Sequence, residues 1–143
     1  VGETFFMMNG DLLTTLSFPE MLAAHRARHA QATVASFRRE VKIEFGLLET
    51  DPSLRMTGYR EKPSFTHLVS MGCYVLERDA VAPYLKPGRH LDMPELMQVM
   101  IGDGRHVQCH IPDCIWLDIG RPDDYARAQD LFANSRETFV RAP

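Results

Sequence analysis

The strand–helix–strand order of the first 38 residues is the feature that most constrains the fold. Residues 4–8 (TFFMM) form a short apolar run that stops at Asn9-Gly10-Asp11, as a buried strand does before a turn. The stretch Ser17-Phe18-Pro19-Glu20 is typical of a helix start, with Pro19 in the first turn. Residues 32–38 read as the next strand, so the segment has the size of a βαβ unit.

The remainder of the chain continues this alternation at its other end. Strands are expected at 41–48, 54–62, 67–77, 107–111 and 115–119, and helices at 79–85, 93–102 and 122–133. The pattern predicts an α/β protein with a Rossmann-like three-layer α/β/α sandwich around a mixed, mainly parallel sheet. We expect one domain over residues 1–133 and a polar tail over 134–143.

Composition excludes several classes of partner. The chain has 143 residues, of which 45% are hydrophobic and 24% charged, as in soluble globular domains. A net charge of −3 argues against nucleic acid as a partner, and no apolar run approaches the ~20 residues that span a membrane. The cysteines, Cys73, Cys109 and Cys114, are odd in number and lack Cys-x-x-Cys spacing, which favours reduced thiols in a cytoplasmic protein.

Two aspartates, Asp11 and Asp118, each follow or end an apolar strand. Ligands of open α/β sheets bind at those strand ends, and two converging carboxylates stay ionised only with a cation between them. Mg²⁺ suits such oxygen ligands and bridges to substrate phosphates. The pair therefore predicts a magnesium site, and the alternative is that Asp118 only caps the turn that follows it.

The stretch 60–64 (REKPS) places Lys62 in a turn that Pro63 makes rigid. A lysine held in this way can contact a phosphate as a point charge, and Glu61 can accept hydrogen bonds from hydroxyl groups. The alternative interpretation is a solvated charge cluster at the surface. His25 and His29 lie four residues apart, but the spacing lacks the glutamate of the zincin pattern and favours an amphipathic surface helix.

Taken in order, five stretches resemble the sugar-1-phosphate nucleotidyltransferases, also called NDP-sugar pyrophosphorylases. These stretches are MMNGD at 7–11, FGLLETD at 45–51, YREKP at 59–63, SMGCYVLE at 70–77 and WLDIGRPDDYARA at 116–128. Each stretch is weak alone, but the order and spacing fit over nearly all of the chain. The resemblance implies transfer of a nucleotidyl group from a nucleoside triphosphate to a sugar 1-phosphate, with release of pyrophosphate.

The resemblance also implies roles for individual residues. Asp11, Lys62 and Asp118 are implied as catalytic residues, with Asp11 and Asp118 as the Mg²⁺ ligands and Lys62 as the contact to the sugar phosphate. Glu61 is implied to bind sugar hydroxyls. The remaining residues of the implied substrate pocket are Gly46 and Gly72, where the backbone approaches the sugar, together with Ser70 and Tyr74.

Two departures from the family pattern limit the inference. Many members have Asn where Ser70 stands, and that Asn helps to read the sugar, so the sugar identity stays open. The Gly-rich loop with Arg and Lys that holds the triphosphate does not occur in the chain. The resemblance therefore implies the C-terminal part of the catalytic domain, a truncated nucleotidyltransferase fold. We expect the 143-residue chain alone to be inactive, and we expect a homo-oligomer.

Three functions follow as hypotheses. The first is nucleotidyl transfer by a larger protein, with guanylyl transfer to a mannose-1-phosphate-like sugar suggested by LDMPEL at 91–96 and WLDIGRPDDY at 116–125. The second is a GT-A-type glycosyltransferase, which usually shows an Asp-x-Asp that the stretch NGDLL lacks. The third is a non-catalytic regulatory or assembly module with the same fold.

Overall fold

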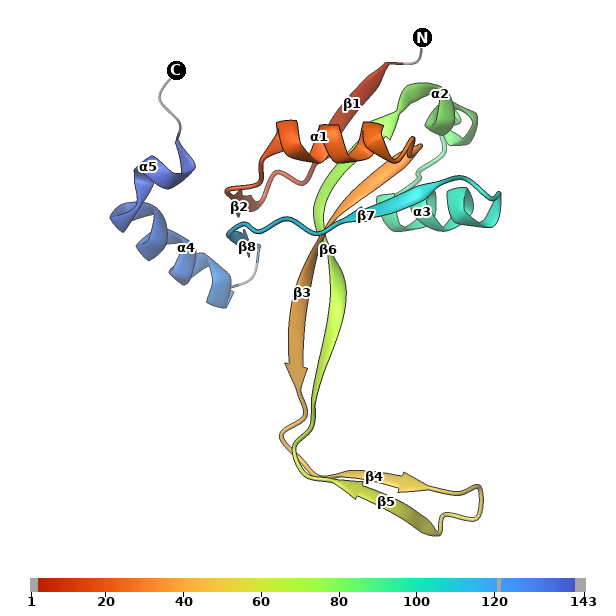
Figure 1. The fold of residues 1–143 in the computed structure, drawn as a ribbon, viewed down its shortest axis with the longest axis vertical. Coiled ribbons are helices and arrows are strands. Elements are labelled where there is room, and N and C mark those ends of the chain that lie inside the picture. Colours follow the sequence, from red (N-terminus) through yellow and green to blue (C-terminus); the bar gives the residue numbers. More distant parts are fainter. Residues whose placement is uncertain (1–2, 121, 141–143) are drawn as a thin grey trace. The chain divides into compact units, whose positions relative to one another are not determined.

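The computed structural model describes residues 3–120 and 122–140, and the chain divides into two compact units. Unit 1 comprises residues 1–37 and 70–143, and unit 2 comprises residues 38–69. Figure 1 shows the order of the elements along the chain. In chain order they are β1 (Thr4–Met8), β2 (Leu12–Thr14), α1 (Phe18–Ala27), β3 (Ala32–Lys42), β4 (Leu47–Thr50), β5 (Met56–Arg60), β6 (Ser64–Glu77), α2 (Arg78–Val81), η1 (Ala82–Tyr84), α3 (Met93–Gly102), β7 (Val107–His110), β8 (Trp116–Asp118), α4 (Pro122–Asn134) and α5 (Arg136–Phe139).

The main sheet has the strand order β1-β6-β3-β7. β1 runs antiparallel to β6, with Thr4 opposite Glu77 and Met8 opposite Cys73, while β3 and β7 are parallel. The smaller pairs β2–β8 and β4–β5 are antiparallel. The prediction of a mixed sheet is confirmed, but the prediction that it is mainly parallel is wrong. The strands β3 to β6 follow one another without a helix, and a parallel connection needs a crossover of a dozen or more residues.

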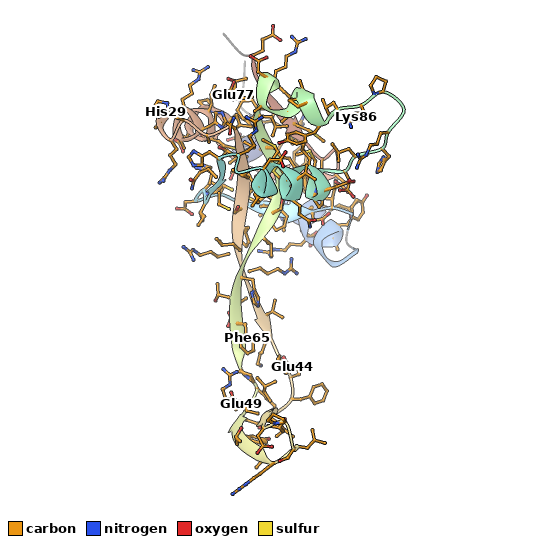
Figure 2. The ribbon with its side chains drawn as sticks, turned by 90° about the vertical axis from the view of Figure 1, so that its right-hand side faces the viewer. His29, Glu44, Glu49, Phe65, Glu77 and Lys86 are labelled. Atoms are coloured by element: carbon orange, nitrogen blue, oxygen red, sulfur yellow. The ribbon has the colours of Figure 1, made fainter. Side chains whose placement is uncertain are left out.

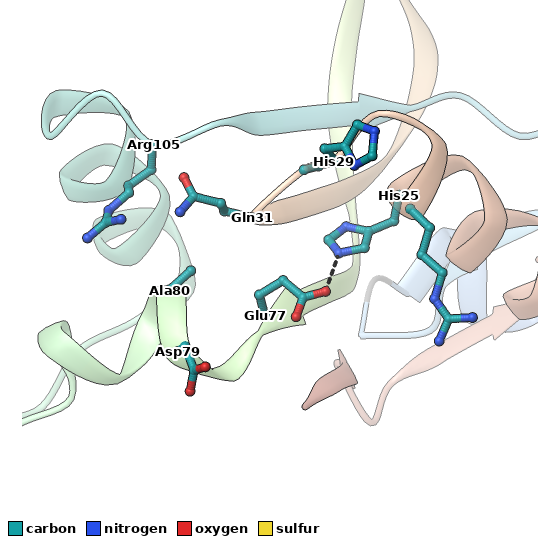
Figure 3. Close-up of a pocket in the computed structure, with 9 residues that line it drawn as sticks. His25, His29, Gln31, Glu77, Asp79, Ala80 and Arg105 are labelled. Carbon is teal, nitrogen blue, oxygen red and sulfur yellow. Dashed lines mark hydrogen bonds and ion pairs between the residues drawn. The ribbon is translucent and has the colours of Figure 1, made fainter. Parts of the chain in front are cut away.

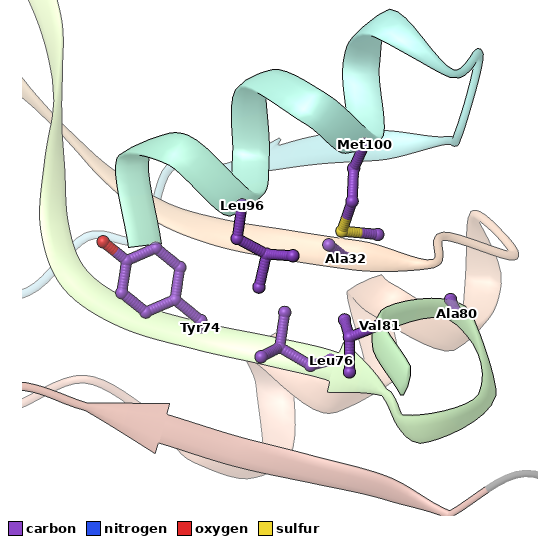
Figure 4. Packing of buried hydrophobic residues seen from close by; sticks show 7 residues of the cluster. All are labelled: Ala32, Tyr74, Leu76, Ala80, Val81, Leu96 and Met100. Carbon is purple, nitrogen blue, oxygen red and sulfur yellow. The ribbon is translucent and has the colours of Figure 1, made fainter. Parts of the chain in front are cut away.

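Helices cover both faces of the sheet in unit 1. Side chains that alternate along β6 belong to two separate cores: Tyr74 and Leu76 face Leu96 and Met100 of α3 (Figure 4). The intervening residues of β6 pack on the opposite face against α1 and the segment around β8, in a core that comprises Leu16, Met21, Ala35, Met71, Cys73 and Val75. The α/β class that the sequence predicted is confirmed, and the Rossmann-like three-layer sandwich stays a prediction.

The helices that cover the sheet begin where the sequence placed them. The Ser17 side chain accepts a hydrogen bond from the Glu20 backbone N–H, and the Asp92 side chain accepts one from the Glu95 N–H. In each helix a proline occupies the first turn, where its missing N–H leaves no hydrogen bond unmade. Within residues 3–120 and 122–140, no helix is both long and apolar enough to cross a membrane.

Unit 2 is built around the hairpin of β4 and β5. The Asp51 carboxylate organises the turn by accepting from the Ser53 hydroxyl and from the backbone N–H groups of Ser53 and Arg55. The Ser53 hydroxyl is the main cause that lowers the pKa of Asp51, followed by the Arg55 N–H. Arg60 pairs with Glu49 at 3.2 Å and lies 5.3 Å from the ring centre of Phe65. Figure 2 labels Glu49 and Phe65.

Several sequence-based boundaries differ from the observed ones. Residues 43–46 are not a strand, because β3 ends at Lys42 and β4 begins at Leu47. β2 was not predicted, and α5 lies inside the segment that was predicted as a polar tail. The division into residues 1–133 and 134–143 stays a prediction.

Candidate functional site

The pairing of β2 with β8 brings the two predicted metal ligands to one place in unit 1. Leu12 lies opposite Asp118 in the antiparallel register, and Asp11 precedes Leu12. The Ile119 backbone N–H donates to the Asp11 carbonyl at 2.9 Å, which extends the ladder by one step. Asp11 and Asp118 therefore leave the same end of this two-stranded ladder, although more than 100 residues separate them in sequence.

Gly120 measures how closely the two carboxylates approach. A Cβ atom on Gly120 would lie 3.0 Å from Asp11 Oδ2 and 3.2 Å from Asp118 Oδ1. Since both oxygens lie so near one point, they are at most about 6.2 Å apart. The structure thus brings the two carboxylates together as the sequence analysis expected, while their role as metal ligands stays a prediction.

The chemistry of this pair fits a hard divalent cation. Among the side chains that the structure describes, no lysine or arginine forms an ion pair with either carboxylate. Two like charges at this separation repel, and a cation between them relieves the repulsion. The described residues also contain no group of three or more His, Cys, Asp or Glu side chains that could hold a metal ion. A site with two carboxylates suits Mg²⁺, which usually keeps water molecules and substrate phosphates as its other ligands.

Asp118 also performs the alternative role that the sequence left open. Its Oδ1 atom accepts a hydrogen bond from the Gly120 backbone N–H at 3.1 Å, so the side chain caps the turn after β8. The side chain is half-buried rather than fully buried. An ionised carboxylate offers about four acceptor positions, so this cap leaves room for a ligand.

Three residues of the predicted substrate pocket are joined in a second group of unit 1. The Ser70 and Tyr74 hydroxyls are 3.1 Å apart, and the Gly72 backbone N–H donates to Ser70 Oγ at 3.2 Å. Tyr74 is buried, and Gly72 has a φ of +74°, a conformation that glycine adopts without strain. This group lies on β6, next to the end of β1.

Asn9 connects this group to the loop that carries Asp11. Its backbone N–H donates to the Gly72 carbonyl at 2.9 Å. Its side chain lies so close to Gly72 that an added Cβ there would be 2.8 Å from Asn9 Nδ2. Sequence reasoning missed Asn9 and Gly120. The available signals were an asparagine just before the Gly10-Asp11 turn and a glycine just after the carboxylate of Asp118.

The other three predicted site residues belong to unit 2. Lys62 is exposed and adopts a φ of +41°, which costs free energy for any residue with a Cβ. Such strained positions cluster at functional sites. Glu61 accepts a hydrogen bond from the Tyr59 hydroxyl at 2.8 Å, and this bond is the main cause that raises the pKa of Tyr59.

The Tyr59 ring lies against Gly46. An added Cβ on Gly46 would overlap the Tyr59 hydroxyl group, so a side chain at position 46 requires the Tyr59 ring to move. Tyr59 thereby joins Gly46 to Glu61, and the predicted contact of Gly46 with a sugar stays a prediction. The structure thus shows two sets of predicted residues, one in each unit.

A cavity of about 600 Å³ in unit 1 is lined by Glu77, the last residue of β6, and by His25 of α1 and Arg105 (Figure 3). None of the predicted site residues lines it. His25, which is almost fully buried, bonds there to Glu77 Oε1 at 3.0 Å and to the Thr33 hydroxyl at 2.8 Å. These contacts tie α1 to the main sheet and give His25 a structural role.

The fold and the site define an α/β protein that places paired carboxylates at the end of its strands. The sequence model of the family described as nucleotidyl transferase matches residues 2–135. The chain therefore belongs to the nucleotidyl transferase family. This finding confirms the family that the five motifs indicated.

Two curated relatives show the range of the similarity. The mannose-1-phosphate guanylyltransferase of Mycobacterium tuberculosis is 28% identical over 130 residues, covering 88% of this chain and 36% of the relative. The glucose-1-phosphate adenylyltransferase of Desulfitobacterium hafniense is 26% identical over 141 residues, covering 88% and 34%. The chain thus spans about a third of the length of these relatives.

Solved structures match the fold. The crystal structure of HddC from Yersinia pseudotuberculosis has a TM-score of 0.60 at 20% identity, covering 90% of this chain and 55% of that chain. The same protein complexed with GMP-PN has a TM-score of 0.59 at 18% identity. At this level of identity the likeness concerns the α/β fold alone.

Proposed function

We propose that the chain forms the sugar-phosphate- and metal-binding part of a sugar-1-phosphate nucleotidyltransferase. In the proposed reaction, an oxygen of the sugar phosphate attacks the α-phosphorus of a nucleoside triphosphate. The new oxygen–phosphorus bond replaces the bond to the β-phosphate, and pyrophosphate leaves. The convergence of Asp11 and Asp118 at Gly120, within the span matched by the family, is the observation that carries this proposal.

Asp11 and Asp118 would hold the metal, whose donor atoms would be their carboxylate oxygens. A bound Mg²⁺ neutralises phosphate charge and orients the phosphate groups. The chain itself supplies the fixed positions of the two carboxylates, because β2 and β8 hold them at one end of a ladder. Transfers of this kind depend mostly on positioning and charge neutralisation, and they need no protein nucleophile.

Lys62 would contact the sugar phosphate, and Glu61 would accept hydrogen bonds from sugar hydroxyls. The exposed, strained position of Lys62 supports this role, since its ammonium group is not used in an ion pair of the described residues. Ser70, Gly72 and Tyr74 would line the substrate pocket, with Gly46 as a further backbone contact. The Ser70 hydroxyl is held by Tyr74, so it is positioned to bond to a ligand.

The remaining proposals concern the whole protein. We propose guanylyl transfer to a mannose-1-phosphate-like sugar, which similarity to the Mycobacterium tuberculosis enzyme supports. The chain contains no Gly-rich phosphate loop, so it would act as the C-terminal part of a catalytic domain and be inactive alone. Family membership favours nucleotidyl transfer over the glycosyltransferase alternative.

Calorimetric titration of the 143-residue chain with mannose 1-phosphate, with and without Mg²⁺, tests the proposal. We expect binding that strengthens with Mg²⁺ and that loses this strengthening in Asp118→Asn. Lys62→Ala should weaken binding about tenfold or more, because a hydrogen bond to a charged group contributes roughly 1.5–3 kcal/mol. Lys42→Ala is the matched control, since Lys42 is an exposed lysine of the same unit that pairs with Glu44.

Two results would contradict the proposal. Equal affinity for mannose 1-phosphate in the presence of Mg²⁺ in the parent, Lys62→Ala and Asp118→Asn chains would show that neither residue contributes to the site. Release of pyrophosphate from GTP and mannose 1-phosphate by the 143-residue chain would contradict the expectation that it is inactive alone. Glucose 1-phosphate in a parallel titration measures the preference for the sugar.

A further inference from the structure

We propose that Gly120 sets the space available to a divalent cation between Asp11 and Asp118, so that a side chain at this position weakens cation binding. The inference rests on the proposed function, because it assumes that the two carboxylates bind a metal. It assigns a positioning role to a residue that contributes no side-chain ligand.

The first argument is the position of the missing side chain. A Cβ on Gly120 would lie 3.0 Å from one oxygen of Asp11 and 3.2 Å from one oxygen of Asp118. Both distances are tighter than ordinary van der Waals contact. The α-hydrogen of Gly120 that a Cβ would replace therefore points toward both carboxylates, and a methyl group there would push against both.

The second argument is that space, and not backbone conformation, requires glycine here. Gly120 does not adopt the positive φ at which side chains are strained, whereas Gly72 does, with a φ of +74°. Alanine at position 120 is thus compatible with the backbone. It also keeps the N–H that donates to Asp118 Oδ1 at 3.1 Å, so the substitution changes the space but not the cap.

The third argument is the coordination chemistry of small divalent cations. Mg²⁺ requires ligand distances of about 2.0–2.1 Å in a nearly octahedral arrangement, which tolerates little displacement of its ligands. A methyl group that moves either carboxylate by a few tenths of an ångström changes the distance on which binding depends. The methyl group also occupies space that a metal-coordinated water molecule could otherwise fill.

Mn²⁺ titration of the 143-residue chain tests this inference, with free Mn²⁺ measured by electron paramagnetic resonance. The variants are Gly120→Ala, Asp118→Asn and the control Gly10→Ala. Gly10 adjoins Asp11, has an ordinary φ, and has no atom within 4 Å of an added Cβ. We expect Gly120→Ala to weaken Mn²⁺ binding about tenfold, the lower end of losses when groups that orient metal ligands are disturbed. Gly10→Ala should bind Mn²⁺ as the parent does.

The outcomes separate this inference from the proposed function. If the parent and Gly120→Ala bind Mn²⁺ equally and Asp118→Asn does not bind, the inference fails and the metal site stands. If the parent and Asp118→Asn bind equally, the metal site fails and the inference fails with it. Asp11→Glu, which keeps Gly120 and the charge but lengthens the side chain into the same space, should also weaken binding. Equal binding by Asp11→Glu and the parent would overturn the inference even if Gly120→Ala did not fold, which circular dichroism detects.

Discussion

Asp118 combines two roles that the sequence presented as alternatives. Its Oδ1 atom caps the turn after β8, and the same carboxylate faces Asp11. The cap fixes the orientation of the carboxylate, which is what a metal ligand needs before the metal arrives. A strand-end aspartate followed by glycine two residues later is therefore a stronger signal for a site than the aspartate alone.

Glu77 shows how a polar group at the end of a strand connects three elements. It accepts hydrogen bonds from Thr4 of β1 at 2.6 Å and from His25 of α1 at 3.0 Å. Partial burial alone would raise the pKa of Glu77. The hydrogen bonds from Thr4 and His25, together with the charges of His25 and Arg26, lower this pKa by more than burial raises it. The pKa of this carboxyl in the folded protein is therefore below its ordinary value of 4.5.

We expect Glu77 to make the stability of the protein sensitive to acid. Because its pKa is lower in the folded chain, its contribution is complete above the ordinary value of 4.5 and is lost as pH falls through the folded pKa. Urea unfolding at pH 7, 5, 4 and 3 should show a smaller loss of stability in Glu77→Gln than in the parent. Other carboxylates, including Asp51, also titrate in this range, so the difference between the two proteins is the measured quantity. Parallel pH profiles would show that Glu77 contributes nothing.

At the scale of elements, local chemistry predicted the helices better than it predicted the sheet. The caps at Ser17 and Asp92 were read correctly because the cap, the proline and the acidic residue lie within four positions. The direction of the sheet was wrong because strand pairing joins distant residues, such as Thr4 with Glu77. β2 was missed because its three residues carry no pattern of their own, and it exists through its pairing with β8.

The two helix caps should differ in strength. The bond from the Glu95 N–H to Asp92 Oδ1 is 2.8 Å, whereas that from the Glu20 N–H to Ser17 Oγ is 3.4 Å. Loss of an N-cap typically costs about 1 kcal/mol. We therefore expect Asp92→Ala to lower the free energy of unfolding by about 1 kcal/mol, and Ser17→Ala by less. Denaturant unfolding of both variants measures the difference, and a larger loss in Ser17→Ala would reverse this ranking.

At the scale of the whole molecule, β1 is one of the two edge strands of the main sheet. Four consecutive large apolar residues of this strand are between 38% and 44% exposed: Phe5, Phe6, Met7 and Met8. Apolar side chains on both faces of β1 are thus exposed. Edge strands commonly carry charged side chains that prevent pairing with another chain, and residues 4–8 carry none. This surface supports the homo-oligomer that we expected from the sequence, with association through β1 as our proposal.

We expect the 143-residue chain to associate in a concentration-dependent manner, and Met7→Lys to reduce this association. A lysine on an edge strand opposes pairing with a second strand. Phe45→Lys is the control, because Phe45 is a 78% exposed apolar residue of unit 2. Sedimentation velocity at several concentrations measures the effect. A monomer at all concentrations, or equal effects of both substitutions, would contradict association through β1.

Local sequence features were enough to name candidate site residues, but they did not predict the contacts between those residues. Asp11, Asp118 and Lys62 were chosen from strand ends and turn chemistry, which are local features. The bond between Ser70 and Tyr74 and the cover of Tyr59 over Gly46 depend on side-chain packing, which spacing does not encode. Gly120 and Asn9 are found only in the structure, because their importance comes from contacts with distant residues: Gly120 with Asp11, and Asn9 with Gly72.

The pairing of β2 with β8 has a consequence for folding during synthesis on the ribosome. Leu12 and Asp118 can meet only after about 100 intervening residues have been made, which takes roughly 5–20 s at about 5–20 residues per second. Closing a loop of this length is entropically costly and slows folding. The nascent chain therefore carries Asp11 without its partner strand until the segment with Asp118 has been made, and the two carboxylates cannot meet before that point.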